Sequence, residues 1–166
     1  FKQRDADRLR DAGGDICRNR ITQVKDLEML DPDAVKSKFE LDPEWPDDLM
    51  AEFENNINAG VVGSKLVSES DRVRVWHISV KPGERLPVHH HVLDYFWTAL
   101  NSGRARSHFH DGRTSESEYR PGDTKHFKFA RGEFMMHDLE NIGETELKFT
   151  TVEFLDSENE VLEIKK

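Results

Sequence analysis

Three consecutive histidines, His89, His90 and His91, are the residues of this sequence best suited to chemistry. A Pro-Gly turn precedes them, and the spacing of their neighbours predicts a short strand. Side chains alternate between the two faces of a strand, so His89 and His91 should point one way and His90 the other. Two imidazoles on one face can bind a transition metal with bonds of about 2.0–2.1 Å. A pair of surface histidines without a metal is the alternative.

The histidine strand belongs to a series of short strands that begins after residue 60. Runs of β-branched and aromatic residues are separated by turn signals such as Asp-Gly, at intervals of about 8–12 residues. Such a series is typical of a β-sandwich or barrel. All eight histidines lie in this part of the chain, so we expect the chemistry there. Besides the histidine strand, the pattern predicts strands over residues 73–80, 94–100, 104–110, 115–119, 123–129, 134–140 and 147–155.

The first 60 residues carry a helical pattern instead. Asp31 followed by proline predicts the start of a short helix, and Pro46 predicts the start of a second. Leu49, Phe53 and Ile57 then recur at helical spacing, together with Met50. We expect this apolar stripe to pack against the outside of the β-part or against a second subunit.

The change of pattern divides the chain into a helical N-terminal extension, residues 1–60, and a β-barrel domain, residues 61–166. Residues 1–20 mix acidic with basic side chains, and we expect them to form a solvated surface arm. The whole chain of 166 residues suits one domain of this kind with its extension.

The composition limits which kinds of partner the protein can bind and which cellular compartment it suits. A formal net charge of −9 opposes nucleic-acid binding, which depends on basic patches. A single cysteine, Cys17, excludes an internal disulfide bond and fits a reducing compartment. No apolar run approaches the length of a membrane span. We therefore expect a soluble, cytoplasmic protein with neither nucleic acid nor membrane as a partner.

Two spacings resemble the motifs of the cupin superfamily, a family of small double-stranded β-helix barrels. Gly83 is followed, after five residues, by His89-x-His91, as in the opening of the first cupin motif. His137 lies four residues before Asn141, as in the second motif. The resemblance covers roughly residues 62–156. It implies a mainly β fold, the cupin jelly roll, with the helical extension outside it.

The resemblance also implies a metal centre. Carried over residue by residue, it assigns His89, His91 and His137 as ligands, while Tyr95 stands where the family has a fourth, glutamate ligand. Three neutral imidazoles suit Fe(II), which we expect first, or Ni(II), Zn(II) or Cu(II). The set looks like that of thiol and diketone dioxygenases of the same superfamily. The resemblance further implies a homodimer.

Other polar residues are candidates for catalysis. The Tyr95 hydroxyl could donate a hydrogen bond to a bound molecule, or could simply belong to a packed core aromatic. His126 could serve as an acid or base if the polar face of its strand points inward, and lies outside if the neighbouring phenylalanines do. His108 and His110 alternate with Phe109 beside two arginines, and this face could bind a carboxylate or be solvated.

Three functions are consistent with these residues. The first is a metal-dependent, dioxygenase-like enzyme that acts on a small anionic or oxygen-rich molecule. The second is a non-catalytic module that binds a small molecule or a metal. The third is a structural barrel whose histidines bind no metal. Elemental analysis of the untagged protein separates the third function from the first two.

Overall fold

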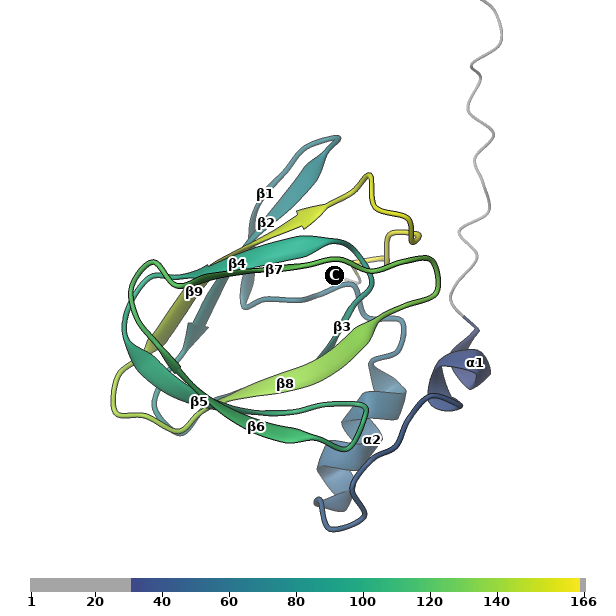
Figure 1. Ribbon diagram of the computed structural model, residues 1–166, viewed down its shortest axis with the longest axis horizontal. Coiled ribbons are helices and arrows are strands. Elements are labelled where there is room, and N and C mark those ends of the chain that lie inside the picture. Colours follow the sequence, from purple (N-terminus) through teal and green to yellow (C-terminus); the bar gives the residue numbers. More distant parts are fainter. Residues whose placement is uncertain (1–30, 165–166) are drawn as a thin grey trace, which may run out of the picture.

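The computed structural model describes residues 31–164, which form nine strands and two short helices. The arrangement of these elements is shown in Figure 1. The helices are α1 (Pro32–Lys36) and α2 (Asp47–Asn55). The strands are β1 (Lys65–Glu69), β2 (Val73–Val80), β3 (Arg85–His91), β4 (Tyr95–Ala99), β5 (Gly103–His108), β6 (Thr114–Tyr119), β7 (Thr124–Phe127), β8 (Met135–Asn141) and β9 (Leu147–Phe154).

The pairing of the strands defines a double-stranded β-helix. β5 and β6 form a hairpin, and the pairs β4–β7, β3–β8 and β2–β9 extend it as one antiparallel ribbon. Successive pairs of this ribbon alternate between two sheets, ordered β1-β2-β9-β4-β7 and β3-β8-β5-β6. The ribbon therefore winds around a central axis, and the two sheets face each other (Figure 1). The predicted fold, a mainly β jelly roll of the cupin type, is confirmed.

Tight turns let the ribbon change sheets. Gly83, between β2 and β3, and Gly122, between β6 and β7, have φ angles of 77° and 89°. Residues other than glycine avoid this left-handed region, so the two Pro-Gly pairs specify the turns where the chain crosses over.

The interior divides into a packed end and an open end. Seven buried residues fill the packed end: Ile78, Val80, Ala99, Ala105, Leu139, Leu147 and Phe149. The histidines of β3 and β8 lie toward the other end, where a cavity remains.

The helical segment covers the outside of the β3-β8-β5-β6 sheet. Leu49, Phe53 and Ile57 are buried there, in one cluster with Val88 of β3 and Met136 of β8. The sequence predicted this apolar stripe, and its partner is the outer face of a sheet within the same chain. None of the described helices is long and apolar enough to cross a membrane.

Some expectations from the sequence lie beyond these observations. The surface arm at residues 1–20 falls outside the described residues, and the division of the chain at residue 60 stays a prediction. β1 was not predicted from the sequence. It is an edge strand with mostly exposed side chains, so it has no alternation of apolar and polar residues to reveal it.

Candidate metal centre and its pocket

A bulge in β3 sets the direction of its histidines. Leu86 pairs with Leu139 of β8, and His89 pairs with His137, so β3 has one more residue than β8 between these two pairs. After the bulge the alternation is regular. His89 and His91 point into the barrel, and the three imidazoles of His89, His91 and His137 meet there.

Helix α2 satisfies the backbone at the bulge. The Val88 amide donates to Glu52 Oε2 at 3.0 Å, and Asn56 Nδ2 donates to the Val88 carbonyl at 2.7 Å. The Pro87 carbonyl lies 2.9 Å from His89 Nδ1. Unpaired buried backbone groups are costly, so α2 stabilises the irregular backbone that directs His89 inward.

The three histidines form a cluster whose ring nitrogens can converge on one ion. One nitrogen of each lies within 4.8 Å of the others. The Nδ1 atoms of His89 and His137 lie at hydrogen-bond distance from backbone carbonyls, at 2.9 and 2.8 Å. A carbonyl only accepts, so both Nδ1 atoms carry the proton and each Nε2 keeps a free lone pair. His91 Nδ1 is buried with no hydrogen-bond partner among the described residues.

Burial keeps these imidazoles neutral. Desolvation lowers the pKa of His89, and it lowers the pKa values of His91 and His137 well below the ordinary value. The neighbouring histidines lower the pKa of His91 further. A metal binds only the neutral ring, so the cluster is in the ligand form at neutral pH.

The donor set fits a divalent transition metal. Three neutral nitrogens on one side, two of them oriented by a carbonyl on the opposite ring atom, are the arrangement that metal-binding histidines favour. The unpartnered His91 Nδ1 is explained if that nitrogen itself coordinates the ion. The identity of the metal does not follow from three imidazoles alone.

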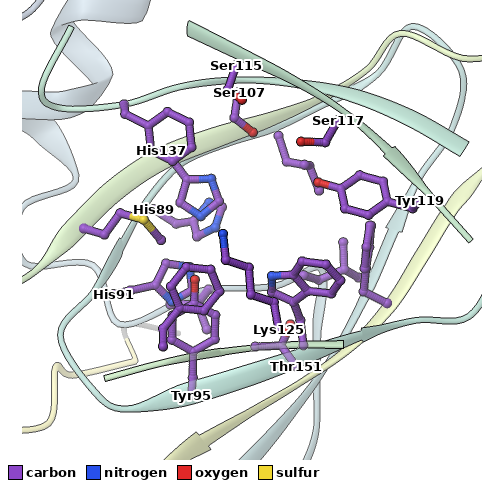
Figure 2. A pocket seen from close by; sticks show the side chains of 18 of the residues that line it. His89, His91, Tyr95, Ser107, Ser115, Ser117, Tyr119, Lys125, His137 and Thr151 are labelled. Carbon is purple, nitrogen blue, oxygen red and sulfur yellow. The ribbon is translucent and has the colours of Figure 1, made fainter. Parts of the chain in front are cut away.

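The cluster faces a cavity of about 500 Å³ between the two sheets. In Figure 2 the three histidines lie on one side of it, while Ser107, Ser115, Ser117 and Tyr119 lie across from Tyr95 and Thr151. His137 is only half-buried, so the cluster is accessible from the cavity.

Tyr95 lines this cavity beside the cluster. Its ring stacks on His91, with 4.1 Å between centroids and 10° between planes. Burial, followed by the nearby Glu153 carboxyl, raises the pKa of Tyr95 well above its ordinary value. The hydroxyl therefore stays protonated and can donate a hydrogen bond.

His126, expected as an acid or base, does not line the cavity. β7 pairs with β4 so that Tyr95 lies opposite Phe127 and Phe96 lies opposite His126. Paired residues share a face, and Tyr95 points inward, so His126 points outward, where its ring lies 5.1 Å from that of Phe96. The inward residues of β7 are Lys125 and Phe127.

The remaining histidines are also held outside the cavity. His108 Nδ1 lies 2.9 Å from Asp138 Oδ2 on the outer face, and His110 accepts from the Met136 amide at 3.4 Å. His90 Nδ1 lies 2.5 Å from the Ile57 carbonyl. The two arginines beside His108 pair with glutamates of β6 and β8. The face of His108 and His110 therefore lies outside the barrel, where it does not reach a carboxylate bound in the cavity.

Several residues of the interior were not singled out from the sequence. Lys125 and Arg113 line the cavity. Glu153, next to Tyr95 across the β4–β9 pair, is a buried acid that accepts a hydrogen bond from Trp76 Nε1 at 2.7 Å. Burial raises its pKa to about 7. Asn141, which the second motif already marks in the sequence, has a structural role, because its side-chain amide donates to the Val80 and Thr145 carbonyls.

Solved structures similar to this one include several cupins. One is a cupin domain from Bordetella pertussis (22% identity, 54% of this chain and 88% of that chain, TM-score 0.48). Another is an RmlC-like cupin with a double-stranded β-helix fold from Methanocaldococcus jannaschii (19% identity, 54% of this chain and 76% of that chain, TM-score 0.45). A third is a sugar phosphate isomerase of the cupin superfamily from Silicibacter pomeroyi (23% identity, 49% of this chain and 50% of that chain, TM-score 0.37).

These likenesses, all below 25% identity, concern the fold alone, which the strand pairing establishes independently. No protein-family model matches the chain, and no curated protein matches it.

Proposed function

We propose that this protein is a metal-dependent enzyme of the dioxygenase type, which acts on a small anionic or oxygen-rich molecule in the cavity. The observation that carries the proposal is the convergence of three neutral imidazoles, two of them buried and that of His137 half-buried, on the wall of a cavity of about 500 Å³. Cavities of this size hold metabolite-sized ligands. We propose Fe(II) as the metal, with Ni(II), Zn(II) or Cu(II) as alternatives.

The residues that line the cavity would have different roles. His89, His91 and His137 would hold the metal on one side and leave positions open toward the cavity. A bound metal supplies Lewis acidity and, for iron, reactivity toward dioxygen. Tyr95 would direct its hydroxyl hydrogen at an oxygen of the ligand. The aromatic rings beside it would limit access of water from that side.

A binding module without catalysis is the second candidate. It is favoured by the outward position of His126, which removes the expected acid or base from the cavity. The two candidates share the metal centre and differ only in turnover.

The first experiment is metal analysis of protein purified without a tag, both as isolated and after anaerobic loading with Fe(II). Near one metal per chain supports both candidates, and failure to retain any metal overturns both. Oxygen uptake by the iron-loaded protein with a panel of small carboxylic and hydroxy acids then separates them. Uptake that produces a stoichiometric oxidised product identifies an enzyme, and tight binding without uptake identifies a binding module.

The homodimer, the absence of a nucleic-acid or membrane partner and the cytoplasmic location stay predictions. Light scattering tests the first of them, and the mass of a single chain at micromolar concentration would contradict it.

A further inference from the structure

Two cations line the cavity, and each lies over an aromatic ring that leads to the histidine cluster. Lys125 Nζ lies 5.0 Å from the centroid of Phe127. Phe127 stacks on Tyr95 at 4.6 Å, and Tyr95 stacks on His91 at 4.1 Å. The aromatic series thus connects the lysine to one proposed metal ligand.

The second series begins at the opposite sheet. Arg113 Cζ lies 4.0 Å from the centroid of Phe109, and Phe109 stacks on His137 at 5.3 Å. Arg113 Nε also lies 3.6 Å from Asp111 Oδ2, so part of the positive charge of Arg113 is already neutralised. Of the two cations, Lys125 is therefore the one with its charge available to a ligand.

The charges around Lys125 strengthen this distinction. Among the described residues Lys125 forms no ion pair. Two acids line the cavity as well: Glu118 Oε1 lies 3.8 Å from Arg104 Nε, and Asp123 accepts a hydrogen bond from the Arg120 backbone amide at 2.8 Å, and neither of these described residues forms an ion pair with Lys125. The chain as a whole carries −9, yet this cavity presents an unpaired cation beside a site for a divalent ion. Such a site attracts anions.

The Lys125 side chain points toward the histidine cluster (Figure 2). In Figure 2 Lys125 extends from β7 into the cavity, with its ammonium group on the side of the histidines. The serines Ser107, Ser115 and Ser117 line the opposing wall and offer hydroxyl groups to further oxygens of a ligand.

We propose that the cavity selects a small carboxylate whose carboxylate group pairs with Lys125 while another oxygen of the same molecule occupies the metal centre. This assignment rests on the proposed function, because it defines the second anchor of the ligand bound there. Lys125 is then a specificity residue, which holds the substrate without taking part in the chemistry.

The test uses dicarboxylates and a neutral analogue as probes. Malonate, succinate, glutarate and succinamide are titrated by calorimetry into the metal-loaded protein and into the metal-free protein. The variant is Lys125→Gln, which keeps most of the side-chain length and removes the charge. The matched control is Lys128→Gln, which makes the same change at an exposed residue that does not line the cavity.

We expect at least one dicarboxylate to bind the wild type. Lys125→Gln should weaken its binding by about tenfold or more, because a hydrogen bond to a charged partner is lost. Lys128→Gln should bind like the wild type, and succinamide should bind weakly and equally to all three proteins. Lys125→Gln should also weaken dicarboxylate binding to the metal-free protein, whose affinity for the dicarboxylate should be lower than that of the metal-loaded protein.

Three results overturn the proposal: no dicarboxylate binds the wild type, Lys125→Gln binds it undiminished, or the neutral diamide binds as tightly as the dianion. Metal content, measured on the same samples, reports separately on the metal centre. If no metal is retained, the proposed function fails, and the metal-free titration still decides the role of Lys125.

Discussion

Histidines lie on both faces of the β3-β8-β5-β6 sheet, and the two groups differ in what surrounds them. On the inner face His89, His91 and His137 bring one nitrogen each within 4.8 Å of the others. On the outer face His90 and His108 are bonded singly, to the Ile57 carbonyl and to the Asp138 carboxylate. The inner group has the geometry of a ligand set, and the outer group attaches the helical segment and the neighbouring strands to the sheet.

A spare nitrogen alone does not distinguish the two groups. His90 Nε2 is buried without a hydrogen-bond partner, as is His91 Nδ1. His90, however, contacts the ring of Phe134 at 5.0 Å and does not belong to the cluster of three. Convergence of several nitrogens, which the register of β3 against β8 determines, is what separates a proposed ligand from a structural histidine.

The largest expected effect concerns the outer face. Asp138 is fully buried and bonds the amide and the ring of His108, with Arg85 at 3.4 Å. Asp138→Ala leaves the amide and the ring of His108 without their partner, while Arg85 keeps its ion pair with Glu52. Two hydrogen bonds to a buried carboxylate are lost, so the free energy of unfolding should fall by about 3–5 kcal/mol in urea denaturation. Metal binding by the folded fraction should survive. A variant as stable as the wild type would show that this buried acid does not stabilise the outer face.

The next effect concerns the inner face. His91→Ala removes one of three ligands, and should weaken metal binding roughly 100-fold or more, since even residues that only orient a ligand contribute about 10–100-fold. His90→Ala should retain the metal, and so should His126→Ala, an exposed control with little risk to folding. Metal per chain, after dialysis of all variants in one buffer, checks the prediction. If the His90 variant loses the metal while the His91 variant keeps it, the two faces have been assigned in reverse.

A smaller effect, on the free energy of unfolding, is expected at Glu153, a buried acid on the other sheet, and this effect depends on pH. The pKa of Glu153 is raised to about 7 by burial, above the value of an unfolded glutamate. Between the two pKa values the folded protein holds a proton that the unfolded chain has lost, so this group destabilises the fold progressively as pH rises toward 7. Glu153→Gln removes the effect.

The Glu153→Gln variant should therefore be more stable than the wild type by about 2 kcal/mol at pH 8 and similar to it at pH 5. The histidines are the same in both proteins, so their titration cancels in the difference. Urea unfolding at the two pH values is the measurement. A difference that does not change with pH would mean that Glu153 titrates normally.

The smallest effect is expected at Tyr95. Tyr95→Phe keeps the ring that stacks on His91 and removes only the hydroxyl, so metal content should not change and stability should shift by less than about 1 kcal/mol. Affinity for a bound small molecule should fall instead. Loss of metal from this variant would indicate that the hydroxyl contributes to the metal centre itself.

The sequence predicted the parts of this comparison that depend on local pattern. Turn residues such as Pro82 and Gly83 indicated where strands end, and the resemblance of the His137–Asn141 spacing to the second cupin motif assigned the third histidine. The spacing of the first motif correctly predicted that His89 and His91 share a face, because the bulge in β3 precedes both residues and leaves the alternation between them regular.

Features that depend on pairing between distant strands could not be predicted. β7 has four residues, and alternation alone allows either His126 or Lys125 to face inward. Its pairing with β4, whose Tyr95 and Trp97 line the cavity, decides for Lys125. Glu153 gave no signal either, since a glutamate in a strand is ordinarily exposed and only the closure of the barrel buries it.

The most direct test of the central claim is a crystal structure of the metal-loaded protein with anomalous diffraction data collected at the absorption edge of the metal. The account predicts one strong anomalous peak per chain, within about 2.0–2.3 Å of a ring nitrogen of each of His89, His91 and His137. A peak on the outer face, beside His90 or His108, or a protein with full metal content and no peak among these three histidines, would contradict it.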